Sequence, residues 1–436
     1  MISGITSKIY SQLGSNTSLL PLAIKDVANS VGLTAGSYVT GQDVEGKDRF
    51  IDEFGTQAIW LGAIPFFKKV TDLTLYKVLG IDPKFDVRNL KNKDILAKAI
   101  EKAPTEKIKQ SIIKASKNPN YTKNLALGKF AFSTIAAIGA YTWLTKFRQK
   151  YRLNEAKEKL KQNSNQNKLH VNIEQKTPQA FGGVHKDNKG NQIPFGGSLQ
   201  EFMFNPAKNM MLLDGAITEE RLRNSESKQE FINYTIKEGG TWAFMYFAGD
   251  IIKKHLEKKS KVPIELDSRI IESKDLKNAF KLGTFKTSLD EFNNLAEKLH
   301  RTPTDLDIYN FIHENPENFI VKMAKKADVI KTLKQNSKKT EIIDTRAYLD
   351  INEFKALKDN LEKLYSKAPV DKMDEYLKKV INSKRSAVLK NMGICVGALG
   401  VAVPLMMIAM RYILPNNKEY KVMEQAKKET SSAKAA

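Results

Sequence analysis

The sequence has one cysteine, few histidines and none of the short motifs that identify common enzymes. Cys395 stands alone among 436 residues, so a single chain can form neither a disulfide framework nor a cysteine metal cluster. The five histidines are scattered, and none stands at ligand spacing from another. No Gly-rich phosphate loop, His-Glu-x-x-His helix or Gly-x-Ser-x-Gly elbow occurs. We therefore expect no catalytic residue, cofactor or metal, and predict a protein that is not an enzyme.

Acidic residues are also in deficit. The chain has 71 Lys and Arg against 49 Asp and Glu, a formal net charge of +22. Such a balance favours an anionic partner, either a membrane surface or a nucleic acid. Most of the basic residues are Lys, whereas base reading and bidentate phosphate contacts favour Arg, so the membrane is the preferred partner. Biased composition without a functional role is the alternative.

The N-terminus lacks the continuous apolar segment of a cleaved secretory signal, so we expect no signal peptide. Two long apolar blocks do occur later. Residues 391–410 carry no charge and are long enough to cross a hydrocarbon layer of about 30 Å. Residues 130–145 are also uncharged, and we predict membrane helices over 127–147 and 386–414. Buried helices of a soluble core are the alternative.

Two shorter apolar blocks, 54–67 and 239–252, are too short for a comfortable straight span. Pro65 interrupts the first block and Asp250 the second. These interruptions predict segments that lie in the membrane interface, re-enter it, or are buried among protein helices. Asp250 is a candidate polar site within the membrane, although a local ion pair with the lysines that follow it is the favoured explanation.

The blocks recur in the same order. "GTQAIWLGAIPFFKK" (55–69) resembles "GTWAFMYFAGDIIKK" (240–254), and residues 129–151 resemble 390–412. Between them, an Asp-x-Arg pair also recurs, which we expect to brace a turn in each copy. The pattern predicts a tandem duplication, although short apolar segments also resemble one another by composition. The paired residues are Asp86 with Arg88 and Asp267 with Arg269.

Small residues in the long blocks allow helix backbones to approach closely in lipid. We therefore predict that the two long blocks pack against each other through Gly139, Gly393, Gly397 and Gly400.

The predicted fold is mainly α-helical, with two related membrane units and a soluble all-helical insertion in the second. Helix starts in the insertion are expected at Ser288–Glu291 and Asp350–Glu353, where capping boxes precede apolar stripes. The expected divisions are a first unit (1–151), a connector with a small hairpin (152–200), the start of the second unit (201–271), the insertion (272–385), a membrane helix (386–414) and a basic tail (415–436).

These features predict a non-enzymatic integral protein of an inner or plasma membrane that acts as a scaffold, anchor or partner-binding adaptor. Its expected partners are the lipid surface and a protein that docks on 272–385. A transporter or channel-like protein of duplicated units is the first alternative. A basic protein that binds nucleic acid or another anionic surface is the second.

Overall fold

The computed structural model describes residues 2–14, 18–39, 43–166, 203–223, 225, 228–260, 266–334, 341–413, 425–428 and 430. The fold is mainly helical, as predicted. The described residues contain one sheet, in which β1 (Thr332–Lys334) pairs antiparallel with β2 (Glu341–Ile343). The insertion is therefore not all-helical, contrary to the prediction.

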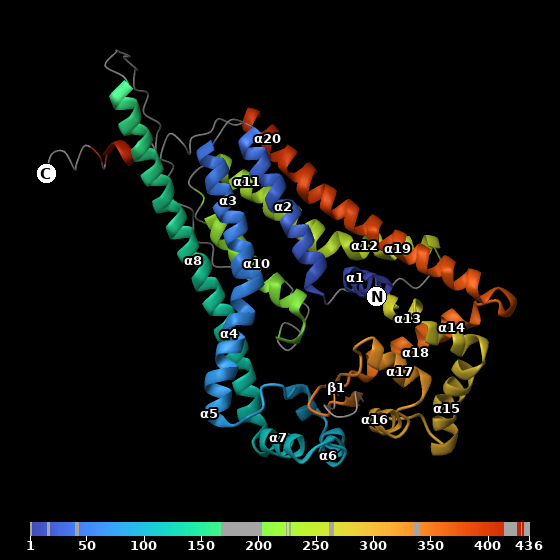
Figure 1. Ribbon diagram of the computed structural model, residues 1–436. Helices are drawn as coiled ribbons and strands as arrows, with labels where there is room; N and C mark the ends of the chain where they lie inside the picture. The colour runs from blue at the N-terminus through green and yellow to red at the C-terminus, as the bar shows by residue number, and fades with distance from the viewer. Residues whose placement is uncertain are drawn as a thin grey trace.

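The molecule has two regions, which we call the bundle and the module (Figure 1). The module is the lower region of Figure 1 and contains η3 (Val87–Lys91), α6 (Lys93–Glu101), α7 (Glu106–Lys117), α13 (Ser268–Ile271), α14 (Lys274–Lys281), α15 (Thr284–Leu299), α16 (Asp305–Glu314), α17 (Phe319–Lys326), the two strands, α18 (Ile351–Ser366) and η5 (Val370–Lys372).

The bundle contains α1 (Ile2–Gly14), α2 (Leu19–Val39), α3 (Asp43–Ala58), η1 (Ile59–Ala63), α4 (Ile64–Thr71), η2 (Asp72–Tyr76), α5 (Lys77–Leu79), α10 (Pro206–Arg223), α11 (Lys228–Thr241), η4 (Trp242–Phe247), α12 (Ala248–Ser260), η6 (Ala398–Ala402) and α20 (Val403–Ile413). It occupies the upper region of Figure 1, except that α4 and α5 extend down towards α7. Two long helices, α8 (Pro119–Gln166) and α19 (Met373–Gly397), begin at the module and continue through the bundle.

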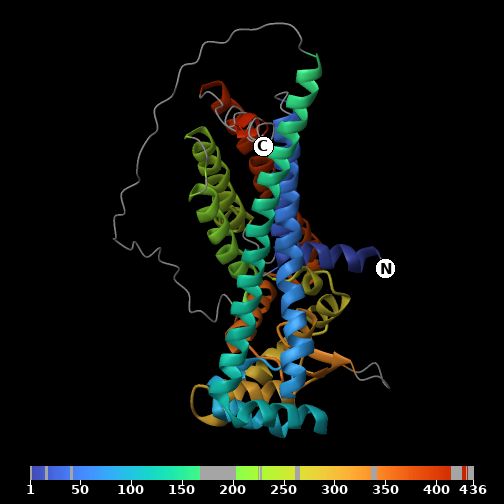
Figure 2. The same ribbon diagram turned by 90° about the vertical axis from the view of Figure 1, so that its left-hand side faces the viewer.

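The short apolar blocks lie inside continuous helices, which corrects the prediction of re-entrant segments. Residues 43–79 form one helical run through α3, η1, α4, η2 and α5, and residues 228–260 form another through α11, η4 and α12. Each run passes through a π-helical turn in its apolar block, η1 in the first and η4 in the second. The π-helical turn is wider than an α-helical turn, and the helix continues beyond it in the same direction. Figure 2 shows the first run lying antiparallel beside α8.

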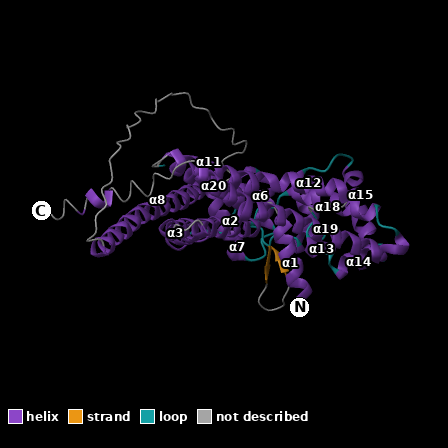
Figure 3. Ribbon diagram, turned by 90° about the horizontal axis from the view of Figure 1, so that it is seen from above, coloured by secondary structure: helices purple, strands orange, loops and turns teal. Residues whose placement is uncertain are grey.

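The two long apolar helices are separated by other elements of the bundle. On one side α2 packs against η6 and α20, on the other it packs against α3, and α3 packs against α8. Seen from above, α8 and α3 lie towards one end of the molecule and α12 and α19 towards the other (Figure 3). The direct packing of the two long blocks that we predicted is therefore not the arrangement of the described helices.

The module has an apolar core that draws on both halves of the chain. Side chains of α13–α18 and the start of α19 form most of it, and Ala99 of α6 is buried among them. The core therefore begins before residue 272 and includes a helix of the first predicted unit, so the insertion is not a self-contained domain.

Helix capping explains one predicted helix start and corrects the other. Asp350 accepts hydrogen bonds from the backbone N–H groups of Asn352 and Glu353, so α18 begins where predicted. By contrast α15 begins after Gly283, whose φ of +77° favours glycine. Ser288 lies inside that helix, and its hydroxyl accepts a hydrogen bond from the N–H of Phe319 at 3.1 Å.

The predicted connector begins as helix, because residues 152–166 continue α8. The hairpin predicted at 181–197 lies outside the described residues, as does most of the tail predicted at 415–436.

Candidate functional site in a buried charged network

Charged side chains meet inside the bundle where α3, α8, α10 and α11 converge. Arg148 of α8 forms ion pairs with Asp48, at 2.9 Å, and with Asp52, at 2.6 Å, both on α3. Arg221 of α10 pairs with the same Asp52 at 3.1 Å and with Glu238 of α11 at 2.7 Å. Asp52 therefore lies between two guanidinium groups and links α3, α8 and α10, and Arg221 extends the network to α11.

The network extends along α11 and across to α8. Lys237 of α11 pairs with Glu53 at 2.7 Å and lies 3.5 Å from Glu238. The hydroxyl of Tyr141 on α8 accepts a hydrogen bond from Nε of Arg221 at 2.9 Å. Each acidic group thus faces at least one cation from another helix.

The network is almost completely removed from water: Asp52 is 0% exposed and Lys237 2%. Taking charges out of water costs several kcal/mol per ion, and only good mutual geometry repays that cost. Loss of one partner leaves the others buried and unpaired. We infer that the network specifies how the four helices meet, rather than supplying most of the stability of the bundle.

A second polar layer lies below the network, around the π-helical turn η4. Lys25 of α2 donates hydrogen bonds to the carbonyl oxygens of Phe244 and Met245, both at 3.1 Å. A change between α- and π-helical hydrogen bonding leaves carbonyl groups for outside donors. The hydroxyl of Tyr246, next in the chain, donates to the carboxylate of Asp214 on α10.

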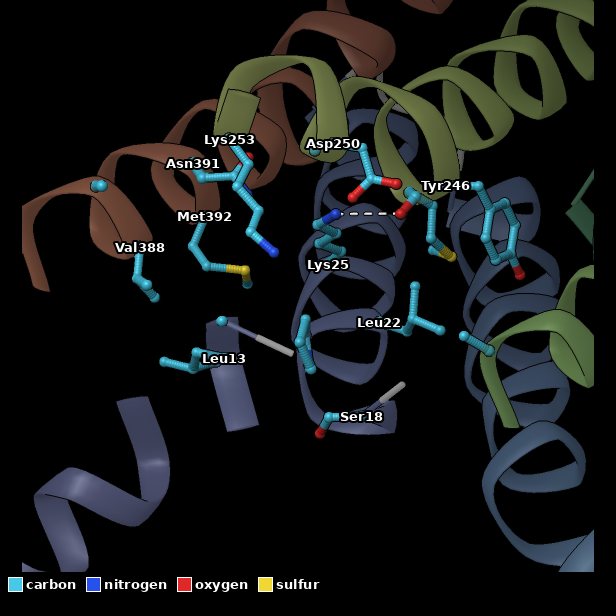
Figure 4. A pocket seen from close by; sticks show the side chains of 16 residues that line it. Leu13, Ser18, Leu22, Lys25, Tyr246, Asp250, Lys253, Val388, Asn391 and Met392 are labelled. Carbon is cyan, nitrogen blue, oxygen red and sulfur yellow. Dashed lines mark hydrogen bonds between the residues drawn. The ribbon is translucent and has the colours of Figure 1, made fainter. Parts of the chain in front are cut away.

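A cavity of about 100 Å³ adjoins this layer, between α1, α2, η4, α12 and α19. In Figure 4, Lys25 and Asp250 lie close together at the wall of this cavity, and the Lys253 side chain extends into it. Asn391 of α19 and Ser18, just before α2, also line it. The structure thus places the predicted polar residue Asp250 beside a buried lysine of a different helix.

The two predicted Asp-x-Arg pairs have the same geometry. Asp86 accepts the N–H of Arg88 and caps η3, while the Arg88 guanidinium folds back on the same carboxylate at 2.7 Å. Asp267 and Arg269 repeat both contacts at the start of α13, with the ion pair at 2.8 Å. Each pair braces the turn before a short helix.

The structure contains a third such pair, Asp344 with Arg346, that sequence comparison missed. Arg346 bonds back to Asp344 at 2.9 Å and also reaches Asp82 at 2.6 Å. Its carbonyl oxygen accepts the N–H of Asp86. This third brace joins the loop before α18 to the turn that precedes η3. A search for Asp-x-Arg alone would have found it.

The four glycines predicted to pack helices behave differently from one another. A Cβ atom built on Gly139, Gly393 or Gly397 would meet nothing within 4 Å. Gly400 lies at a close crossing, but its partner is α2: a Cβ on Gly32 would lie 2.1 Å from the Gly400 carbonyl oxygen. Gly32 is the residue that the sequence reasoning overlooked.

No group of three or more His, Cys, Asp or Glu side chains in the described part of the chain is placed to hold a metal ion. Cys395 is buried, with its thiol 3.8 Å from the Asn391 side-chain oxygen. The arrangement that the bundle does provide is a set of internally neutralised charges and a small polar cavity.

Sequence reasoning also missed most of the network, although one signal was available. At the shift of 185 that aligns the short apolar blocks, Glu53 falls on Glu238 and Asp52 on Lys237. Lys237 pairs with Glu53 and lies near its sequence neighbour Glu238, while Asp52 pairs with Arg148 and Arg221. Extending the alignment upstream by a few residues would have identified the four aligned residues.

Comparison of the chain with protein-family models, with curated proteins and with solved structures found no match in any of the three.

Proposed function

We propose that the bundle is embedded in a membrane and that the protein is a non-enzymatic scaffold that holds the module at one membrane face. The observation that carries the proposal is the inverted amphipathicity of α2. Its outward residues include Val27 and Val31, which are 43% and 51% exposed. Its inward residues include Asn29 and Ser30, which are 1% and 0% exposed. A helix in water has the opposite arrangement.

The same inversion extends over the bundle. The residues between 79 and 118 and between 266 and 372 include a single exposed large hydrophobic side chain among those described, Leu282. The bundle has many, and most belong to α2, the 43–79 run, α8, α12 and the α19–α20 run. An apolar surface of this extent suits lipid rather than water.

The lengths of the apolar helical segments also fit the thickness of a membrane. Two described segments, 119–160 and 373–410, are long and apolar enough to span, and only 33% of the most apolar stretch of each is buried within the protein. On α8 the stretch from Phe130, next to the partly exposed Lys129–Asp72 pair, to Phe147 contains Lys146 as its single charged residue and spans eighteen residues, or about 27 Å of helix. This length matches a hydrocarbon layer of about 30 Å.

We further propose that the bundle arose by tandem duplication, with the two copies parallel. Moving the α2–α3 pair by 185 residues gives 204–224 and 228–243, which match α10 and α11 closely. A π-helical turn follows the second helix in each copy. The capped Asp-x-Arg turns come next, at a shift of 181. The same order of elements in both copies supports the duplication.

The scaffold role is supported by how the module joins the bundle. Within α8, Leu125 packs in a core beside the module and Ala137 in the bundle core. Within α19, Val380 packs in the module core and Val388 against α1. Two uninterrupted helices therefore fix the orientation of the module relative to the membrane. A partner protein that binds the module would be held at that surface.

Fractionation of the expressed full chain tests the proposal. Membranes are washed with alkaline carbonate and then with a non-ionic detergent. We expect the protein to stay in the pellet until detergent is added. Release by carbonate would contradict the proposal, and the charge of +22 would then favour the nucleic-acid binder, testable as salt-sensitive pelleting with nucleic acid.

One observation favours a transporter as the second candidate. Buried charges lie where α3 and α11, equivalent helices of the proposed copies, face each other, and transporters of duplicated units bind their substrates at such junctions. Substrate-dependent flux in liposomes, lost on Arg221→Met, would support this candidate over the scaffold. We favour the scaffold because each acidic group of the network is neutralised by a partner from the chain itself.

A further inference from the structure

The cavity beside Lys25 has the position and the charge of a headgroup site. Three of its lining residues stand at the ends of apolar stretches of the chain. Asn391 is the first residue of the uncharged run 391–410, Lys253 directly follows the block 239–252, and Ser18 immediately precedes α2. In a membrane these positions lie at the boundary between hydrocarbon and headgroups, on the side of the bundle that faces the module (Figure 1).

The charges that line the cavity are two ammonium groups and one carboxylate. Lys25 and Lys253 are 5% and 9% exposed, and both come from helices of the bundle. Asp250 lies beside Lys25 in Figure 4, while the Lys253 ammonium reaches the middle of the cavity. The lining residues therefore include one more cation than anions. The amide of Asn391 provides a neutral donor at the cavity wall.

The remaining walls are apolar. Leu13 of α1 and Leu22 of α2 line the side of the cavity opposite Asp250, and Met392 of α19 lies beside Lys253 (Figure 4). A volume of about 100 Å³ admits a phosphate group but not a whole lipid, so acyl chains would remain outside, against the apolar surface of the bundle. Basic pockets between membrane helices commonly bind anionic headgroups in this way.

We propose that this cavity binds the phosphate of an anionic phospholipid, with Lys253 and Lys25 as the cationic contacts and Asn391 as a neutral donor. The proposal rests on the membrane location of the bundle. Free phosphate and small phosphate esters share the recognised group, and the lipid is preferred because of the position of the cavity at the membrane boundary and its apolar walls.

The test is thermal unfolding of the delipidated full chain in a non-ionic detergent, with phosphatidylglycerol, with phosphatidylcholine of the same acyl chains, or with glycerol 3-phosphate. Phosphatidylglycerol is expected to raise the midpoint of wild type, whereas the other two ligands leave it unchanged. In Lys253→Met the concentration for half-maximal stabilisation should rise about tenfold. The matched control is Lys254→Met, an exposed neighbour on the same helix that does not line the cavity.

Equal stabilisation of Lys253→Met and wild type by phosphatidylglycerol would overturn the site, because the lipid would then act through general surface charge. An equal effect of phosphatidylcholine would overturn the recognition of an anion. An equal effect of glycerol 3-phosphate would overturn the lipid as the source of the phosphate. If Lys253→Met does not fold, Asn391→Leu provides the same comparison. A chain that stays soluble and monodisperse without detergent contradicts the membrane proposal itself, whichever ligand stabilises it.

Discussion

The bundle and the module differ in where they place charged and apolar side chains. In the module Phe354 and Leu361 are completely buried, and the outer surface is charged. In the bundle Asp52 is completely buried, while Ile135 and Trp143 of α8 lie on the outside. A single chain therefore follows two rules of burial, one suited to water and one to lipid. Whether the apolar or the polar face of a helix turns outward therefore depends on whether water or lipid surrounds that region.

The two interiors also differ in what they contribute. Apolar burial in the module stabilises the fold roughly in proportion to the area removed from water. Buried ion pairs in the bundle add little net stability, but they penalise every arrangement that separates the partners. The bundle should therefore be sensitive to the loss of single charges, whereas the module should be sensitive to the loss of volume.

The sharpest contrast should come from Arg221→Met, which removes the guanidinium between Asp52 and Glu238. Two buried carboxylates would lose a partner, and we expect a loss of about 3–5 kcal/mol. Thermal unfolding of the detergent-solubilised chain measures it. Arg223→Met on the same helix, whose side chain is exposed, should change stability by less than about 0.5 kcal/mol. Similar effects for both variants would contradict a structural role for the network.

Leu361→Ala should damage the module and leave the bundle intact. Truncation of this buried side chain is expected to cost about 3 kcal/mol. Hydrogen exchange should accelerate in α18 but not in α3. Leu282→Ala, at an exposed position of the same region, serves as the control and should be close to neutral. Acceleration in both regions would mean that they unfold as one unit, which would weaken the comparison.

Gly32→Ala tests the closest helix crossing in the bundle. The new methyl group would meet the Gly400 backbone, so α2 and η6 must separate, at a cost of about 2 kcal/mol. Gly397→Ala, where a Cβ has open space, should be neutral or slightly stabilising. Crosslinking between α2 and α20 in membranes would report the separation. A larger loss of stability in Gly397→Ala than in Gly32→Ala would instead support the helix packing through Gly397 that was predicted from sequence.

The smallest expected effect is a pH dependence confined to the module. Burial, with lesser contributions from Lys102 and Lys325, lowers the pKa of His313 from 6.5 to about 4. The unfolded chain binds this proton at higher pH than the folded protein does. The contribution of His313 to stability is therefore complete above about pH 6.5 and is lost as the pH falls towards 4.

Hydrogen exchange in α16 at pH 7 and pH 5, with intrinsic rates corrected, measures this dependence in wild type and in His313→Gln. The variant should lose less protection than wild type over that range. An equal loss in both proteins would assign the pH dependence to other groups.

Local features of the fold were predictable from sequence because their causes are local. The cap at Asp350 and the uncharged run 391–410 depend only on neighbouring residues, and both agree with the structure. The start of α15 was misjudged because Ser288 and Glu291 bond to Asn318 and Phe319 at the start of α17 instead of capping their own helix. The two strands have three residues each, too few for a periodic signal.

The candidate site was predictable only in part. The sequence shows which residues are charged, but not whether their side chains face the interior or the surface. The block 54–67 looked too short to span because Asp52 and Glu53 bound it on one side. Both carboxylates face inward and are paired, so they do not end the apolar surface of their helix. Their partners on α8 and α11 lie about a hundred or more residues away, and only the tertiary structure brings them together.

The most direct test of the central claim is fluorescence quenching of Trp143, one of three tryptophans, which is 66% exposed on the outer face of α8. The full chain and Trp143→Phe would each be reconstituted in vesicles with lipids brominated along their acyl chains, and iodide would serve as the aqueous quencher. We predict that brominated lipid quenches wild type strongly, that Trp143→Phe loses most of this quenching, and that iodide has little effect on either. Strong quenching of Trp143 by iodide, with none by brominated lipid, would place the outer face of α8 in water and contradict a membrane-embedded bundle.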